Sequence, residues 1–467
     1  MSKYYITILI ILSAFTHFIY FGRPAELVFD EVYFGNFASA YNTGMYFFDI
    51  HPPLGKLLIS AAGYIGGFNA VSTDYAAIGN TFTDSAYIWY RILPILAGFL
   101  LPIVIFLLCR KLKLSPLASF LAGLFIILEN SLLIQSRFIF LDSFLLLFGF
   151  LSLYFYLSAR QSESRRHFLL NFILSAIFVT LSFSVKWTGL SFFGLIALAE
   201  TWDLFRNVKS FVVWKKYFFR ALLFSLISFI IYFSIFAIHF SLLPKSGPGD
   251  AFMTQSFQKT LEGSDQVNNI NTKPLGLAGK FLELNEEMYL ANKTLTFKHT
   301  YSSEWYSWPY MARPIYYWVH KESLEGAPLV ESKIYLLGNP FIYWLSSLAV
   351  ILLIMQMFFK SLYQRSFCWK GYKVPTFIII GYLANLLPFI LIGRVMFLYH
   401  YLSALVFAII IMVYLIDQIK VHRRKIAISV GLLLLFTVSF IFFSPFSYGL
   451  PLDTDHQNER FWFSNWI

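Results

Sequence analysis

The chain has 467 residues, of which 58% are hydrophobic, 20% aromatic and 13% charged. This is more apolar surface than a soluble core of this length buries, so the composition predicts an integral membrane protein. The formal net charge is +11, but the basic residues form no cluster on a soluble face or tail, which argues against a nucleic-acid partner. The two cysteines, Cys109 and Cys368, indicate neither a disulfide framework nor a zinc site.

Eleven apolar runs are long enough to approach or cross a hydrocarbon layer of about 30 Å. They lie at 4–21, 88–109, 114–131, 138–158, 168–184, 188–205, 219–243, 340–359, 374–392, 396–416 and 426–444. The expected fold class is an all-α polytopic membrane protein with about 11 transmembrane helices. The first run resembles a signal sequence, but HFIYFGRP (17–24) offers no small-residue cleavage site, so we expect a retained span.

Basic residues predict the orientation of the spans. Lys and Arg concentrate in five connectors, at 110–113, 159–166, 206–220, 360–373 and 417–425, which we expect on the cytoplasmic side. The amino terminus is then cytoplasmic and the carboxyl terminus lies outside. Two long loops, 22–87 and 244–339, are also expected on the non-cytoplasmic face, and residues 1–467 form one membrane domain.

The stretch FDEVYFGNFASAYNTGMYFFDIHPPLGK (29–56) directly follows the first span and carries the first candidate site. Asp30 and Glu31 are expected near a helix start, with Gly44 as a helix stop. An Asp there is often only an N-cap. Two adjacent carboxylates followed by Asp49 and His51 favour a site, in which Asp49 and His51 shape the return to the membrane or an acceptor groove.

Isolated cations form the second candidate group, at the same face of the membrane: Arg91, Arg137, Lys186 and Arg394. Any one of them could reach the interface by snorkelling. Four together indicate a countercharge for a lipid-linked phosphate.

Further polar residues mark the same face. Tyr399 and His400 end a span beside Arg394, and are either an interface pair or part of a site. Asp142 is expected to pair with a basic group within the bundle.

Several motifs of other function classes are missing. The sequence contains no Walker-type loop and no HExxH, and its one DxD, at 453–455, is isolated in the carboxyl-terminal tail, so we expect no metal site and no cofactor. A transporter remains open, although its polar groups would be expected near the membrane midplane. A glycosyltransferase that modifies a lipid or a cell-wall glycan also remains open.

The motifs resemble those of the protein O-mannosyltransferase family, membrane enzymes of the GT-C glycosyltransferase class. The matching segments follow the order of the family over nearly the whole chain: 29–56, YRILPILAG (90–98), SRFIFLDSFLLLF (136–148), VKWTGL (185–190), 239–263 with SGPGDAF, YSSEWYSWPYMARPIYYW (301–318), GNP (338–340) and 385–402. Members of the family that have a β-trefoil MIR domain carry it in the second long outer loop. Here 244–339 leaves no room for it.

The resemblance implies inverting transfer of mannose from polyprenyl (dolichyl) phosphate mannose to Ser or Thr of a translocated protein. It implies that Asp30 is the general base, that Glu31 is essential beside it, and that Arg91 is functionally important. The expected partners are the lipid-linked donor, the acceptor polypeptide, membrane lipid, and a translocon or a homo- or hetero-dimer partner. The expected location is a bacterial inner membrane, or the endoplasmic reticulum in a eukaryote, with the site on the non-cytoplasmic side.

Overall fold

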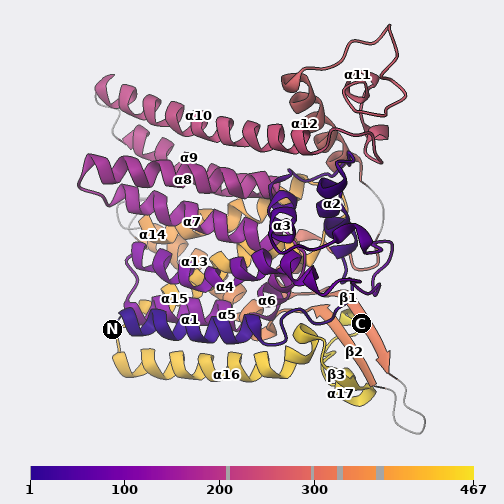
Figure 1. Cartoon of the computed structure of the whole chain (residues 1–467). Helices are drawn as coiled ribbons and strands as arrows, with labels where there is room; N and C mark the ends of the chain where they lie inside the picture. The colour runs from indigo at the N-terminus through magenta and orange to yellow at the C-terminus, as the bar shows by residue number, and fades with distance from the viewer. Residues whose placement is uncertain (1, 207–210, 296–298, 323–329, 364–372) are drawn as a thin grey trace.

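The computed structural model describes residues 2–206, 211–295, 299–322, 330–363 and 373–467. Long helices lie side by side, and a layer of short helices and strands covers one end of them (Figure 1). The chain starts at the end of the bundle away from this layer and finishes within the layer (Figure 1). The two termini therefore lie at opposite ends of the bundle, as an odd number of crossings requires.

Within the described residues, eight helices are long and apolar enough to cross a membrane. They are α4 (Ile88–Lys111), α7 (Asp142–Arg160), α8 (Arg165–Val185), α10 (Phe211–Leu242), α13 (Pro340–Tyr363), α14 (Lys373–Ala384, continued by a 3₁₀ helix), α15 (Leu402–Asp417) and α16 (His422–Tyr448). The bent pair α5 (Pro116–Ile127) and α6 (Asn130–Arg137) forms a ninth if it is one span. The expected helical membrane fold is confirmed, but the number of eleven spans is not.

The two remaining apolar runs of the sequence form shorter helices. They are α1 (Ser2–Phe18) and α9 (Leu190–Arg206), and each has 17 residues. Each of the eleven runs thus lies on a helix, but length alone does not make every one of them a full crossing. Cys109 is buried and unpaired, and Cys368 lies outside the described residues.

A buried polar residue lies where the chain bends by 58° between α5 and α6. Glu129 lies in the break, fully buried, and accepts hydrogen bonds from the backbone N–H groups of Ser131 (2.8 Å) and Asn339 (3.0 Å). A buried carboxylate needs such donors. The backbone N–H groups next to the break and in the GNP segment at 338–340 therefore supply the hydrogen bonds that the buried carboxylate of Glu129 requires.

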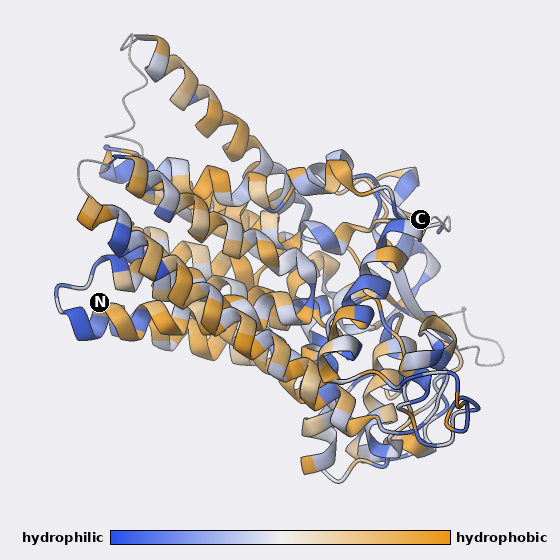
Figure 2. Ribbon diagram, turned by 90° about the horizontal axis from the view of Figure 1, so that it is seen from above, coloured by the Kyte–Doolittle hydropathy of each residue, from blue (hydrophilic) through white to orange (hydrophobic). Residues whose placement is uncertain are grey.

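Burial divides the helices into central and peripheral ones. The span of α15 is 78% buried, whereas that of α10 is only 22% buried and that of α16 28%. In Figure 1, α10 and α16 form the two margins of the bundle. Apolar residues cover the long helices, and hydrophilic residues gather towards the ends of the molecule (Figure 2). The peripheral helices thus present apolar faces suited to lipid.

The layer that covers one end of the bundle, named the outer layer below, is built from the two long loops (Figure 1). The first contains α2 (Glu31–Thr43) and α3 (Leu54–Ile65), and the second contains α11 (Gln255–Gln258) and α12 (Leu277–Thr294). The predicted stop of α2 is confirmed, because Gly44 follows the helix with a φ of 75°, in the left-handed region.

The SGPGD motif joins the two loops to each other. The Tyr46 N–H donates to the Lys245 carbonyl (2.9 Å), and the Gly249 N–H donates to the Tyr46 carbonyl (3.1 Å). A Cβ on Gly249 would lie 2.4 Å from the backbone of Phe47. Only a glycine permits this approach.

A three-stranded antiparallel sheet completes the outer layer and was not expected in an all-α chain. Its order is β1 (Ile315–Glu322), β2 (Val330–Leu336) and β3 (Pro451–Asp453). The register shifts between Tyr316 and Trp318, so that Tyr317 is the extra residue of a β-bulge. Sequence patterns missed the sheet because its third strand has only three residues and comes from the distant carboxyl-terminal tail.

Candidate active site

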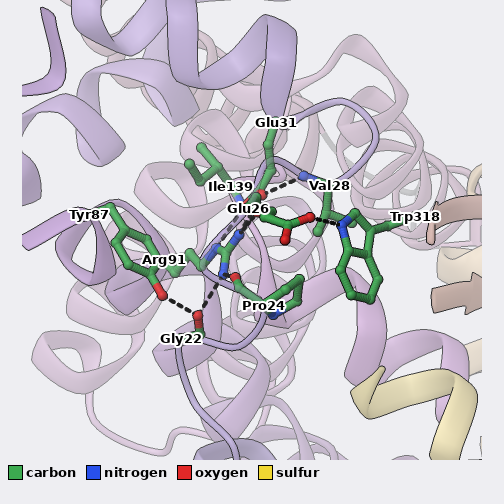
Figure 3. Close-up of polar contacts among 9 residues, drawn as sticks. All are labelled: Gly22, Pro24, Glu26, Val28, Glu31, Tyr87, Arg91, Ile139 and Trp318. Carbon is green, nitrogen blue, oxygen red and sulfur yellow. Dashed lines mark hydrogen bonds and ion pairs between the residues drawn. The ribbon is translucent and has the colours of Figure 1, made fainter. Parts of the chain in front are cut away.

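A buried ion pair between Glu31 and Arg91 anchors the acidic loop. Arg91 donates from Nε to Glu31 Oε1 (2.7 Å) and from Nη2 to Glu31 Oε2 (2.6 Å), and both side chains have 0% exposure. The backbone N–H groups of Val28 (2.9 Å) and Ile139 (2.8 Å) donate to the same carboxylate (Figure 3). Both oxygens of Glu31 are thus occupied by donors of the protein.

The remaining donors of Arg91 are also occupied. They reach the carbonyl oxygens of Gly22 (3.1 Å), Pro24 (2.6 Å) and Glu26 (2.8 Å) in the segment that enters the loop (Figure 3). A guanidinium group has five N–H donors, and here each of them has a partner in the protein. Arg91 therefore ties α4 to residues 22–31.

Asp30 is held next to this anchor but makes no comparable contacts. Its side chain is half-buried and, although it directly precedes α2, accepts no capping hydrogen bond. Burial raises the pKa of Asp30 to about 7, a shift that the positive charge of Lys186 opposes and the charges of Asp142 and Asp49 increase. Asp30 is thus a carboxylate that can take up a proton near neutral pH.

The backbone before Asp30 has an unusual conformation. Phe29 has a φ of +46°, which costs free energy for any residue other than glycine. Its ring stacks on Tyr317, with centroids 4.3 Å apart and planes at 12°. Its N–H donates to the Tyr317 carbonyl (3.2 Å). The sheet therefore holds the chain in the turn that presents Asp30.

Lys186 is fixed by a carboxylate of α7. Its Nζ donates to Oδ1 (2.8 Å) and Oδ2 (2.9 Å) of Asp142, which also accepts from the side-chain amide of Gln135 (2.7 Å). Nζ lies 5.1 Å from the centroid of the Tyr399 ring. Asp142 has the expected basic partner, which is Lys186 rather than the nearby Arg137.

Asp49 and His51 belong to a second turn of the same loop. Lys56 forms an ion pair with Asp49 and donates to the His51 carbonyl (2.8 Å). Burial, with the charges of Lys186 and Arg394, keeps the pKa of His51 well below its usual value. Asp49 thus stabilises the turn, and His51 presents a neutral ring.

Arg394 has few contacts in comparison with Arg91. One Nη of Arg394 lies 3.3 Å from Nε2 of His400. Because arginine can only donate, Nε2 of His400 is the acceptor of this contact, and Nδ1 lies within hydrogen-bonding distance of both the N–H (3.1 Å) and the carbonyl (3.0 Å) of Phe397. His400 also stacks on Tyr399, with centroids 4.6 Å apart. In the part of the chain that the structure describes, no other group accepts a hydrogen bond from Arg394, which leaves most of its guanidinium available to an anion.

Several of these groups line a cavity of about 640 Å³. Its polar lining includes His51, Asp142, Lys186, Lys293, Arg394, Tyr399 and His400. Its apolar wall comes from α7 and α9, with Leu145, Leu146, Leu190, Gly194 and Leu198. The cavity can therefore hold an anionic group next to a long apolar one. Within the described residues, no group of three or more His, Cys, Asp or Glu side chains could hold a metal ion.

Two family models match most of the chain. The model described as "Dolichyl-phosphate-mannose-protein mannosyltransferase" matches residues 7–244, and that described as "C-terminal four TMM region of protein-O-mannosyltransferase" matches residues 277–466. The chain belongs to the protein O-mannosyltransferase family. The resemblance predicted from the motifs is thereby confirmed.

Similar proteins agree with this family. The chain is 32% identical over 284 residues to dolichyl-phosphate-mannose–protein mannosyltransferase 1 of Candida albicans, a match that covers 58% of this chain and 31% of that protein. It is 33% identical over 262 residues to protein O-mannosyltransferase 1 of Drosophila melanogaster, covering 55% of this chain and 30% of that protein. The chain thus spans about a third of the length of these curated relatives.

A solved structure shows the same fold. The protein O-mannosyltransferase Pmt1-Pmt2 complex of S. cerevisiae, bound to the sugar donor, matches with a TM-score of 0.90 at 20% identity, over 100% of this chain and 92% of that chain. This likeness confirms the predicted GT-C class of fold.

The site residues that were predicted from the sequence fall into two groups. His51, Lys186, Arg394, Tyr399 and His400 line one cavity, and Asp30 and Asp49 lie within electrostatic reach of it. Glu31, Arg91 and Arg137 do not line it.

Three of the five donors of Arg137 are also engaged by the protein, whereas its buried Nε has no hydrogen-bond partner among the described residues. Arg137 donates to the carbonyls of His17 (2.9 Å), Ile19 (2.9 Å) and Tyr20 (2.8 Å) at the end of α1. These carbonyls lack partners within the helix. The sequence shows a cation at the membrane face, but not the backbone groups that already surround it.

Three residues near the site were not predicted: Gln135, Lys293 and Tyr317. Lys293 lines the cavity from α12, and Tyr317 donates to Gln135 (2.9 Å). Tyr317 lies inside the motif segment 301–318, which was the available signal for it, whereas Gln135 directly precedes the segment 136–148. Their contact joins residues 182 positions apart, which no local pattern reveals.

Replacement of Arg91 by methionine is expected to destabilise the fold. The change leaves Glu31 as a buried charge without its partner, which costs about 3–5 kcal/mol. The thermal unfolding midpoint in detergent should fall sharply, whereas the exposed Arg23→Met should leave it unchanged. A stable R91M protein that has lost only donor binding would contradict this structural role.

Proposed function

We propose that the chain transfers mannose from a polyprenyl or dolichyl phosphate carrier to Ser or Thr hydroxyls of proteins. Membership of the family and the names of its relatives support the class of donor and acceptor. The observation that carries the proposal is the contrast between Asp30, which has no hydrogen-bond partner for its carboxylate among the described residues, and the cationic cavity beside it.

Asp30 acts as the general base in this proposal. A Ser or Thr hydroxyl is a weak nucleophile, so its proton must leave as its oxygen attacks C1 of the mannose. The hydroxyl oxygen forms the new bond to C1, the proton goes to Asp30, and the bond between C1 and the phosphate oxygen breaks with its electrons staying on the phosphate. Attack from the face opposite the phosphate inverts the anomeric centre.

Lys186 and Arg394 stabilise the phosphate that leaves. Both line the cavity, and charge-assisted hydrogen bonds to phosphate are among the strong ones. We limit the phosphate site to these two of the four predicted cations, because the donors of Arg91 and most of those of Arg137 are engaged by the protein. The apolar wall formed by α7 and α9 is suited to the start of the polyprenyl chain.

The distribution of basic residues supports a proposed location, and the yeast relative supports a proposed partner. The distribution of Lys and Arg favours a site on the non-cytoplasmic face of the membrane, with a bacterial inner membrane as our first choice and the endoplasmic reticulum membrane for a eukaryotic chain. A protein emerging from a translocon could reach Asp30 there. The yeast relative was solved as a Pmt1-Pmt2 complex, and we infer that this chain also works in a homo- or hetero-dimer.

Asp30→Asn should abolish most transfer while leaving the protein folded. Loss of a general base costs roughly 10²- to 10⁴-fold in rate. The measurement is release of mannose from dolichyl phosphate mannose onto a Ser/Thr peptide by the purified protein, with Asp265→Asn, an exposed aspartate of the second loop, as the matched control. Near-normal turnover by D30N would remove Asp30 from the role. Transfer to a lipid in place of the peptide would favour the other class of glycosyltransferase.

The rate should rise with pH through about 7, because Asp30 must be deprotonated to accept the proton and burial raises its pKa to about that value. The Lys186 charge lowers this pKa, and the charges of Asp142 and Asp49 raise it. Lys186→Gln should therefore move the midpoint of the pH–rate curve to higher pH. Lys293→Gln removes another cation of the cavity and should leave the midpoint in place. An unchanged midpoint in K186Q would show that Asp30 is not the group whose deprotonation sets the pH–rate curve.

A further inference from the structure

Tyr317 is the bulge residue of β1. It contacts both Phe29, in the loop that carries Asp30, and Gln135. A β-bulge turns a side chain away from the regular alternation of the strand. The Tyr317 side chain is almost fully buried, at 1% exposure, and its hydroxyl donates to Oε1 of Gln135 (2.9 Å). The bulge therefore directs a hydroxyl of the outer sheet into the membrane bundle.

The hydrogen bond from Tyr317 is the first of a series that ends at Lys186. The amide of Gln135 donates to Oδ2 of Asp142 (2.7 Å), and Asp142 accepts both contacts from Lys186 (2.8 and 2.9 Å). All four side chains are buried. Polar groups in such surroundings hold one another in fixed orientations, because an unpaired one is costly.

The orientation of the Gln135 amide is determined by its two neighbours. The end that faces Asp142 must be the NH₂ group, because a carboxylate can only accept. The amide oxygen of Gln135 then faces Tyr317 and accepts the hydrogen bond from its hydroxyl group. Glutamate at this position would set a second carboxylate against Asp142, so glutamine suits the position and glutamate does not.

The same tyrosine contacts the loop that carries Asp30. Its ring stacks on Phe29 and its carbonyl oxygen accepts the Phe29 N–H. One residue thus supports both the backbone before the candidate base and, through Gln135 and Asp142, the candidate phosphate ligand.

We propose that Tyr317 and Gln135 are positioning residues that hold Lys186 at a fixed separation from Asp30. This inference rests on the proposed function, in which the base and the phosphate ligand act on opposite faces of one sugar carbon. Such a reaction depends strongly on the distance between the two groups, and a misplacement of about 1 Å can cost roughly 10²-fold.

Tyr317→Phe separates the two connections, because it keeps the stacked ring and removes only the hydroxyl. Lys186 then loses its support, and the KM for dolichyl phosphate mannose should rise about tenfold, the effect of one lost buried hydrogen bond. Gln135→Glu should raise this KM at least as much. Phe29→Leu should instead lower kcat with little change in donor KM, because it loosens the loop of Asp30 and leaves the series from Tyr317 to Lys186 intact.

Tyr316→Phe is the matched control, since this neighbouring tyrosine packs against Tyr335 rather than Gln135. A merely structural role would reduce the amount of active protein and so lower the apparent kcat at an unchanged donor KM. A donor KM in Y317F equal to that in Y316F would overturn the inference, even if D30N abolishes transfer. If the unmodified protein transfers no mannose at all, the proposed function fails instead.

Discussion

The buried ion pair between Glu31 and Arg91 is the constraint on which the site depends. Two charges taken out of water are costly, and the pair is stable only because every polar atom has a partner. Glu31 accepts four hydrogen bonds, and all five donors of Arg91 are engaged. This arrangement fixes α4, the loop entry at 22–26 and the start of α2 relative to one another. Asp30, one residue before Glu31, is consequently held in place although its carboxylate has no hydrogen-bond partner among the described residues.

Structural and chemical tasks are divided between charged residues that look alike in the sequence. Arg91 and Arg137 bind backbone carbonyls within residues 17–26, whereas Lys186 and Arg394 line a cavity. The same division separates the two adjacent carboxylates. Glu31 is saturated with donors, and Asp30 is left to accept a proton. A pair of acids that appears redundant in the sequence therefore consists of an anchor and a candidate base.

Much of the fold could be predicted from the sequence, because apolar runs report membrane helices directly. The stop of α2 at Gly44 was predictable for a local reason, since glycine readily adopts a positive φ. The sheet was not, because β3 joins it from more than a hundred residues away. At the site, residue type predicted five residues that line the cavity, but neither the contribution of Lys293 nor the occupied state of Arg91. Partners such as the carbonyls of Gly22 and Pro24 carry no signal in the sequence, and only the fold brings them to the guanidinium.

We propose that Arg91 belongs to the anchor, while Lys186 and Arg394 bind the donor. A structure of the protein with dolichyl phosphate mannose bound tests this most directly. We expect the phosphate within hydrogen-bonding distance of Lys186 and Arg394, the sugar carbon between the phosphate and Asp30, and Arg91 still paired with Glu31. A phosphate held by Arg91 or Arg137, with Glu31 released, would contradict this division of roles.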